Sequence, residues 1–358
     1  MNGEVAESLS LIFPGTRVSE FSRGSAGLYK IFKILKELNG AGEIVLPNLC
    51  CETVALAALC AGHKVRFADV DGQRFCVTPQ SISEVMGPLT RAVVIVHLFG
   101  LTVDASAFHE LRRLKPDVLF IEDVAHAAGG CDITGREVGS GFDHVMFSFS
   151  ESKILGGHGG AIVSYRLDEI TDRLHGQNFT TSEPKIDPLF ALSLRNFTHA
   201  IADLERAGSS HAEGEIAHSF WEHFYPLVTY EGKICEASKA LVDLRNRVSI
   251  RERRNSRVIN YRERINQNNI FIPEFSNLES CWRLPILAET PELRRRITDS
   301  LRHKGLQVSN HYFQLSRLFS TEDLKMSKYV SDRLINLWVD DTITDLTVTE
   351  TARIINSI

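Results

Sequence analysis

The chain has 358 residues, of which 43% are hydrophobic and 24% are charged. Its 45 acidic and 40 basic side chains give a formal net charge of −5, so there is no basic excess to attract nucleic acid or an anionic membrane. This composition excludes collagen-like, disordered and low-complexity chains, and at roughly 150 residues per domain the length indicates about two domains.

The start of the chain and its cysteines bear on its location. The first ten residues, MNGEVAESLS, lack the basic end and apolar core of a signal peptide, and the longest apolar runs have only the length of strands. The 7 cysteines, an odd number, indicate reduced thiols, and their spacing offers no zinc site. We therefore expect a cytoplasmic enzyme with no metal and no membrane-spanning segment.

Residues 23–165 alternate between helical and strand-like patterns. Helical spacing begins at Ala26 and returns in ETVALAALCAG and SAFHELRRL, while four β-rich runs are expected to form strands: 43–46, 64–70, 91–96 and 117–123. Apolar strands that alternate with helices predict an α/β fold with a mostly parallel sheet covered on both faces. Ligands bind such sheets beyond the carboxyl ends of the strands, so polar residues that directly follow a strand are the candidates for function.

The pattern weakens after residue 165, and residues 180–230 receive no firm assignment. The charged stretch over 233–268 suits one long amphipathic helix, whose arginine run we interpret as a solvated face. A smaller unit should follow, with WRLPIL as a strand, TPELRRRITDSLRHKG as a helix that ends at Gly305, and ETARIINSI as a last helix. We expect a large α/β domain over 1–232 and a small C-terminal α+β domain over 233–358.

Three features lie just beyond predicted strands. Asp123 ends an apolar run and His126 follows it; Lys153 follows a β run and precedes a glycine cluster; and the small-residue turn RGSAG opens the first long helix. Each has an ordinary explanation by itself, since a strand-end aspartate often caps a helix, a loop lysine is usually solvated, and a small-residue turn is often only a turn.

One cofactor would use all three features together. Pyridoxal phosphate needs a lysine that holds its aldehyde as a Schiff base and a carboxylate that keeps its pyridine nitrogen protonated. Its phosphate favours backbone N–H groups and hydroxyls at a helix N-terminus. Asp123 and Lys153, with Gly24, Ser25 and Ala26 in the turn, supply this set. Once an incoming amine displaces it, Lys153 can act as general base and acid at the substrate carbon.

The motifs also follow one another in a definite order: RGSAGLYKIF, IVLPNLCCETVALAALCAGHKVRFADVD, VVIVHLFG, IEDVAHAAGG and FDHVMFSFSESKILGGHGGAIV, then NHYFQL and INLWVDD. The series resembles the DegT/DnrJ-type sugar aminotransferases, which are fold-type-I pyridoxal-phosphate enzymes of nucleotide-sugar and polysaccharide biosynthesis. The likeness covers much of the chain but is thin from 165 to 230.

The resemblance implies a role for each matched residue. Lys153 would be the Schiff-base lysine, Asp123 the partner of the ring nitrogen, and His126 a neighbour of the cofactor's 3-hydroxyl. The phosphate would be held by Ser148, Gly24, Ser25 and Ala26. The family also implies a homodimer with active sites at the subunit boundary, glutamate as the amino donor, and a nucleotide-linked keto-sugar as the acceptor.

Three departures from the family pattern stand out. Cys51 occupies the position of an aromatic residue that stacks on the cofactor ring, so we expect Cys51 beside that ring. His158 replaces an acid in the glycine turn, and Glu231-Gly232-Lys233 replaces a partner-subunit segment that completes the phosphate site. These changes concern the phosphate contacts and the substrate, and they leave Asp123 and Lys153 in place.

Several alternatives remain open from the sequence. The leading hypothesis is a transaminase; the others are a pyridoxal-phosphate enzyme of different chemistry, such as a sugar dehydratase or an enzyme acting on a non-sugar substrate, and a non-catalytic regulatory homologue. His97 is expected either in a structural hydrogen bond or against the cofactor or substrate. His311 and Tyr312 are expected either to contact the substrate or to pack in the small domain.

Overall fold

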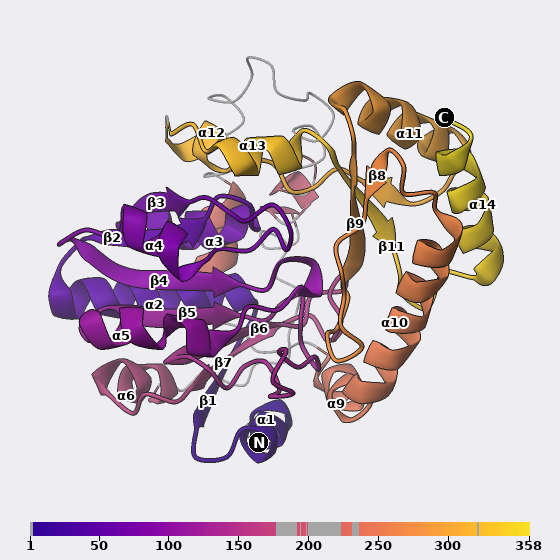
Figure 1. Cartoon of the computed structure of the whole chain (residues 1–358). Helices are drawn as coiled ribbons and strands as arrows, with labels where there is room; N and C mark the ends of the chain where they lie inside the picture. The colour runs from indigo at the N-terminus through magenta and orange to yellow at the C-terminus, as the bar shows by residue number, and fades with distance from the viewer. Residues whose placement is uncertain are drawn as a thin grey trace.

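The structure is a computed structural model that describes residues 3–176, 192–193, 195–197, 199, 223–230, 236–320 and 322–358 (Figure 1). Most of the unassigned stretch 180–230, and the Glu231-Gly232-Lys233 segment, lie outside these residues. Among the helices that are described, none combines the length and the apolar character needed to cross a membrane.

The larger part of the structure is built on a seven-stranded sheet in the order β1-β7-β6-β5-β4-β2-β3. Its strands are β1 (Arg17–Phe21), β2 (Glu43–Pro47), β3 (Lys64–Ala68), β4 (Thr90–Val96), β5 (Leu119–Asp123), β6 (His144–Ser148) and β7 (Gly160–Ser164). Strands β3, β2, β4, β5 and β6 run parallel, whereas β7 pairs antiparallel with both β6 and β1. The four predicted strands and the mostly parallel sheet are confirmed.

Helices cover both faces of this sheet (Figure 1). The elements are α1 (Glu4–Ile12), α2 (Gly24–Asn39), α3 (Glu52–Cys60), α4 (Pro79–Val85), α5 (His109–Leu114), α6 (Glu169–His175) and the short 3₁₀ helices η1 (Leu98–Gly100) and η2 (Ala105–Phe108). Helix α2 packs against α3 and α6 on one face, and α4 and α5 lie on the other. Both faces of the sheet are therefore buried, as continuous apolar strands require.

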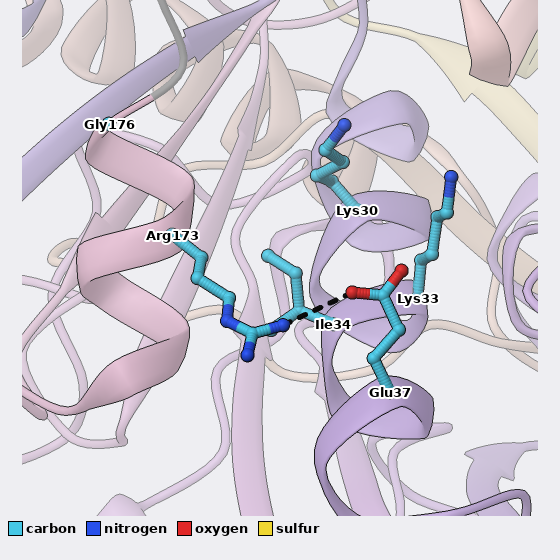
Figure 2. Close-up of a pocket in the computed structure, with 6 residues that line it drawn as sticks. All are labelled: Lys30, Lys33, Ile34, Glu37, Arg173 and Gly176. Atoms are coloured by element: carbon cyan, nitrogen blue, oxygen red, sulfur yellow. Dashed lines mark hydrogen bonds and ion pairs between the residues drawn. The ribbon is translucent and has the colours of Figure 1, made fainter.

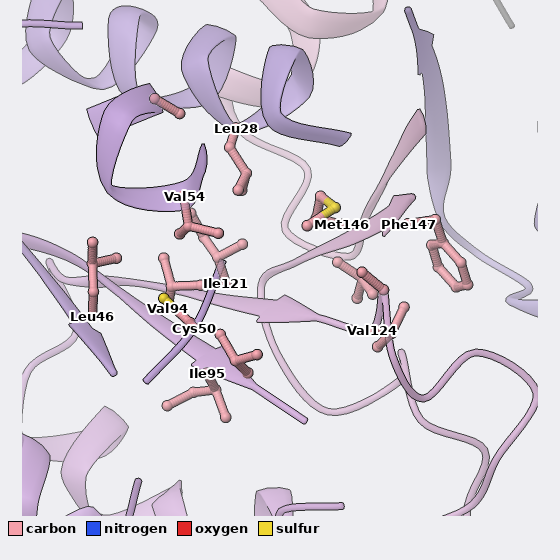
Figure 3. Packing of buried hydrophobic residues seen from close by; sticks show 14 of the residues in the cluster. Leu28, Leu46, Cys50, Val54, Val94, Ile95, Ile121, Val124, Met146 and Phe147 are labelled. Carbon is pink, nitrogen blue, oxygen red and sulfur yellow. The ribbon is translucent and has the colours of Figure 1, made fainter. Parts of the chain in front are cut away.

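Close packing fixes the two helices that matter most for the site. Leu28 of α2 and Val54 of α3 lie among the core side chains of the sheet, including Val94, Ile121 and Met146 (Figure 3). Interiors packed at this density transmit small displacements, so the N-termini of α2 and α3 are held firmly relative to the strand ends. Both N-termini face the carboxyl edge of the parallel strands.

The C-terminal part contains a four-stranded antiparallel sheet in the order β10-β11-β9-β8. Its elements are α9 (Ala237–Arg245), α10 (Arg247–Arg264), β8 (Ile270–Phe271), β9 (Arg283–Ala288), α11 (Pro291–His303), β10 (Val308–Ser309), α12 (Ser316–Phe319), α13 (Lys325–Ser331), β11 (Leu334–Trp338) and α14 (Asp345–Asn356). The predicted strand, the helix before Gly305 and the last helix are confirmed; Gly305 has a φ of +71°, which suits a residue just past a helix end.

A second hydrophobic cluster fills this C-terminal part, with Leu284 and Ile286 of β9 facing Ile335 of β11 under α11 and α14. Helix α9 instead packs into the cluster of the large sheet through Leu241 and Leu244. The predicted boundary between residues 232 and 233 falls outside the described residues, so it stays a prediction.

The prediction of one long helix over 233–268 is wrong. Helix α9 ends at Arg245 and α10 begins at Arg247, with Asn246 between them at φ −95° and ψ 9°. The reason is that the two halves have different partners. Leu244 of α9 packs in the large core, whereas Tyr261 of α10 packs in the C-terminal cluster. One straight apolar stripe cannot face both cores.

The interpretation of the arginine run as a solvated face is also wrong for part of that run. Arg247 makes a two-pronged ion pair with Glu137, with Nε 2.7 Å from Oε1. Arg254 is buried and donates a 2.9 Å hydrogen bond to the carbonyl of Trp282. These arginines attach α10 to the segments before it and after it.

Candidate active site

Asp123, His126 and Lys153 meet at the carboxyl edge of the large sheet. Asp123 is the last residue of β5, His126 follows in the next turn, and Lys153 lies in the loop that reverses the chain from β6 to β7. Lys153 Nζ lies 2.8 Å from His126 Nε2. The structure thus brings together the three residues that the sequence predicts as catalytic.

Asp123 is a buried carboxyl group, only 4% exposed. Its Oδ1 accepts a 2.9 Å hydrogen bond from the Ala125 N–H. Burial raises the pKa of Asp123 to about 6, against the opposing effects of the Ala125 N–H and the charges of Lys153 and His97. The side chain is therefore ionised at neutral pH, and it gains a proton more readily than an exposed aspartate.

His126 is held in one protonation form by its neighbours. Burial, followed by the charges of Lys153, Arg283 and His311, lowers its pKa well below the usual value, so the ring is neutral. The Phe99 N–H donates to Nδ1 at 3.3 Å, which assigns the ring proton to Nε2. Nε2 faces Lys153 Nζ and, at 3.0 Å, the hydroxyl of Tyr312.

This tautomer bears on the protonation state of Lys153. An Nε2–H that donates to Lys153 requires a lone pair on the amine, which a charged ammonium does not have. Burial lowers the pKa of Lys153, although the carboxylate of Asp123 raises it. A lowered pKa makes the neutral amine, which is the nucleophilic form of lysine, more accessible than it is for an exposed lysine.

Trp282 of the C-terminal part forms a wall of the site. Its ring is stacked on His126, with centroids 3.9 Å apart and planes 4° apart, and Lys153 Nζ lies 4.6 Å from the indole centre. The indole N–H donates to the carbonyl of Ser152 at 2.5 Å, and the Trp282 backbone N–H donates to the carbonyl of Phe99 at 2.9 Å. Sequence analysis did not single out Trp282, and the signal available was an aromatic residue at the start of the predicted strand WRLPIL.

Cys51 and Glu52 begin helix α3 on another side of the site. Burial, and next the charge of Glu52, raise the pKa of Cys51 to about 12 while the charge of Lys153 lowers it, so the side chain is a thiol and not a thiolate. Glu52 is 2% exposed and pairs with His311 Nε2 at 3.3 Å. Burial works to raise the pKa of Glu52, but the hydrogen bond and charge of His311 prevail and the pKa is lowered. Sequence analysis did not single out Glu52 as a site residue.

The predicted phosphate contacts lie at the N-terminus of α2. Gly24, Ser25 and Ala26 form its first turn and are buried. A Cβ on Gly24 would clash with Met146 and would lie 3.3 Å from the Cβ of Ser148, so the turn and Ser148 are in close contact. Ser25 is 7% exposed, and within the described part of the chain neither serine hydroxyl has a hydrogen-bond partner. Free N–H groups and two unpartnered hydroxyls form a suitable site for an anion.

The other predicted residues have mainly structural contacts. His97 Nε2 bonds Glu122 Oε1 at 2.8 Å and its Nδ1 accepts from the Val103 N–H, which confirms a structural hydrogen bond. His158 is exposed, with Nε2 3.7 Å from Glu236 at the start of α9. Within the described residues no group of His, Cys, Asp and Glu side chains is suited to a metal ion.

A separate pocket of about 350 Å³ lies on the outer side of α2 and α6 (Figure 2). It is lined by Lys30, Lys33, Ile34, Glu37, Arg173 and Gly176, so it contains none of the predicted site residues. Arg173 and Glu37 pair across it at 3.2 Å. This pocket is therefore distinct from the strand-end site.

A family model described as the DegT/DnrJ/EryC1/StrS aminotransferase family matches residues 18–358. The chain belongs to this family. The sequence-based identification is thus confirmed, and it now covers the C-terminal part as well as the motifs around Lys153.

Curated relatives of this aminotransferase-family chain match it over shorter segments. A UDP-N-acetyl-3-dehydro-alpha-D-glucosamine 3-aminotransferase of Acidithiobacillus ferrooxidans is 36% identical over 130 residues, or 36% of this chain and 35% of the relative. An L-glutamine:2-deoxy-scyllo-inosose aminotransferase of Streptomyces kanamyceticus is 29% identical over 151 residues, or 41% of this chain and 35% of the relative. The matches span about a third of the length of these relatives.

Solved structures establish the fold. Helicobacter pylori PseC, an aminotransferase involved in the biosynthesis of pseudoaminic acid, has a TM-score of 0.76 at 17% identity and covers 98% of this chain and 89% of its own. The sugar aminotransferase CalS13 from Micromonospora echinospora has a TM-score of 0.72 at 19% identity and covers 99% and 91%. The predicted α/β fold class is confirmed.

Proposed function

We propose that the protein is a pyridoxal-phosphate-dependent aminotransferase that moves an amino group from glutamate to a keto group on a sugar, most simply a nucleotide-linked sugar. The observation that carries the proposal is the Lys153–His126 contact of 2.8 Å beside the buried carboxyl group of Asp123. The proposal includes the cytoplasmic homodimer and the two domains, 1–232 and 233–358, expected from the sequence.

The residues fit the cofactor at each of its polar groups. The proposed contacts are Lys153 for the aldehyde, Asp123 for the ring nitrogen, His126 for the 3-hydroxyl, Cys51 for the ring face, and Ser148 with Gly24, Ser25 and Ala26 for the phosphate. The Ser25 hydroxyl supports the phosphate assignment, because it is buried without a partner among the described residues and buried hydroxyls are normally hydrogen-bonded. Ser148 lies next to it across Gly24. When bound, pyridoxal phosphate supplies an electron sink for a carbanion at the substrate carbon.

The protein's own groups then have defined tasks. An ionised Asp123 keeps the ring nitrogen protonated, which its pKa of about 6 allows at neutral pH. Lys153, as a free amine beside the substrate carbon, would remove and return a proton there. His126, fixed by the Phe99 N–H and by Trp282, orients that amine.

The named relatives support a keto-sugar or cyclitol acceptor. One is named for a 3-dehydro-glucosamine nucleotide and others for a scyllo-inosose with L-glutamine as donor. The retained Lys153 favours transamination over two of the alternatives, since neither a dehydratase that dispenses with the lysine nor a non-catalytic homologue would need it. The half-reactions below distinguish sugar from non-sugar acceptors.

The test is a pair of half-reactions on the reconstituted protein. Glutamate or glutamine should abolish the visible absorption band of the bound cofactor and release the matching keto acid, and one member of a panel of nucleotide keto-sugars and inososes should restore the band. Lys153→Ala should lower turnover at least about 100-fold, because it removes the proton-transfer group. Wild-type protein that shows no visible band with the cofactor, or that releases no keto acid with any donor, would contradict the proposal.

A further inference from the structure

We propose that Arg23 binds the phosphate of the cofactor from within the same subunit, as the cation that completes the anion site at the N-terminus of α2. This inference rests on the proposed function. It adds to the predicted phosphate set, Gly24, Ser25, Ala26 and Ser148, a charged residue that neither the motif analysis nor the family match assigns.

The position of Arg23 is the first argument. Arg23 is the N-cap of α2, with an extended backbone at φ −154° and ψ 157°, and its side chain makes no capping hydrogen bond. The first free N–H groups of the helix follow it directly. Gly24 and Gly160 are in backbone contact, because a Cβ on Gly160 would clash with Gly24. The turn is thus fixed against β7 and cannot drift away from Ser148.

The second argument is that Arg23 has no counter-ion among the described residues. Within the part of the chain that the structure describes, the Arg23 guanidinium has no hydrogen bond and no ion pair. Burial lowers its pKa, while the carboxylate of Glu52 raises it. Glu52 is already paired with His311, and Cys51 is a neutral thiol. A partly buried guanidinium without a partner is costly, and an anion placed at this site would remove that cost.

The chemistry of the missing group matches these observations. A phosphate ester near neutral pH carries about 1.5 to 2 negative charges and accepts several hydrogen bonds. Helix N–H groups and the hydroxyls of Ser25 and Ser148 provide donors, but none of these carries a full positive charge. A guanidinium provides both charge and a planar set of donors.

One other role for Arg23 predicts a different result. Arg23 lies near enough to Cys51 to interact with it electrostatically, and the family resemblance puts Cys51 at the position of a stacking aromatic residue. The guanidinium would then lie over the cofactor ring and not against its phosphate, as cations do on aromatic faces. A ring contact strengthens the binding of pyridoxal as much as that of pyridoxal phosphate, whereas a phosphate contact strengthens only the latter.

The experiment compares the two compounds on the cofactor-free protein. Binding of pyridoxal phosphate and of pyridoxal is titrated by visible absorbance for wild type, Arg23→Met and Arg23→Gln, and unfolding temperatures of the cofactor-free proteins check folding. Each variant should weaken pyridoxal phosphate binding roughly 10- to 100-fold and leave pyridoxal binding unchanged. Arg23→Lys, which keeps the charge, should recover part of the preference for the phosphorylated compound.

The matched control is Arg17→Met, which removes an arginine from the same β1 region. Arg17 pairs with Asp172 on the surface, so this variant should bind both compounds as wild type does. Equal weakening of both compounds by Arg23→Met and Arg23→Gln, or no change in either, overturns the phosphate contact. Wild type that binds neither compound covalently contradicts the proposed function itself, which separates the two failures.

Discussion

The two ends of the candidate site differ in how their polar groups are satisfied. At the amine end, Lys153 contacts His126, and backbone N–H groups bond the side chains of Asp123 and His126. At the phosphate end, the hydroxyls of Ser25 and Ser148 have no partner in the described part of the chain. The comparison teaches that the catalytic groups are organised by the fold itself, whereas the phosphate end depends on a bound anion to complete it.

Asp123→Asn should give the largest contrast between stability and function. The folded pKa of Asp123, about 6, is higher than the ordinary aspartate value of 3.8, so its ionisation in the fold is unfavourable. Protonated Asp123 therefore contributes to the free energy of unfolding of the cofactor-free protein at low pH. This contribution, about 3 kcal/mol, should be lost as the pH rises from about 4 through 6. Asn avoids this loss, so the cofactor-free variant should be more stable than wild type at pH 7 and turnover should fall strongly.

Denaturant unfolding of both proteins from pH 4 to 8 measures this effect, with a turnover assay beside it. Asp143→Asn is a useful control, because Asp143 directly precedes β6 and pairs with Arg112 at 3.0 Å. A pH dependence of unfolding that is the same in wild type and Asp123→Asn would show that Asp123 is not a strained carboxylate.

Trp282→Leu should have a smaller effect, confined to the amine end. Loss of the ring stacked on His126 frees the imidazole, so kcat should fall about 3- to 10-fold with little change in cofactor affinity. Trp282→Phe keeps an aromatic face but loses the hydrogen bond to Ser152, and it should retain more of the kcat. Steady-state kinetics over pH distinguishes the two variants. An increase in the cofactor dissociation constant without a change in kcat would contradict the assignment of Trp282 to the amine end.

Ser25→Ala and Ser148→Ala should have the smallest effects, confined to the phosphate end. Each removes one hydroxyl donor, so the affinity for pyridoxal phosphate should fall about fivefold while the affinity for pyridoxal stays the same. Ser140→Ala is the control, since the Ser140 hydroxyl donates to the Glu137 carbonyl away from the site. Absorbance titrations that show equal affinities for all four proteins would remove the serines from the phosphate site.

The sequence predicted the local parts of this molecule better than the distant contacts. Strand-length apolar runs and helical spacing are local properties, and they were sufficient for β2 to β5 and for α2 and α3. Sequence analysis does not predict the break at Asn246, because the break depends on which hydrophobic core each half of the stretch packs against. No local pattern within residues 237–264 indicates those partners.

The candidate site shows the same limit. Asp123, His126 and Lys153 were found because each closely follows a strand and because the motif order matches a family. Tyr312 meets His126 across 186 positions of sequence, and Trp282 meets Ser152 across 130. Such pairs arise only when the C-terminal sheet docks beside the large sheet. Glu52 was not predicted either, because an acid at the start of a helix is normally explained by the helix dipole alone.

The most direct test of the account is the identity of the lysine that holds the cofactor. The wild-type protein is incubated with pyridoxal phosphate and reduced with borohydride, and the modified peptide is identified by mass spectrometry. The account predicts that the modification lies on Lys153, in the loop between β6 and β7, and that Lys153→Ala abolishes it. Modification of a different lysine in the wild-type protein, or none at all, would contradict the central claim.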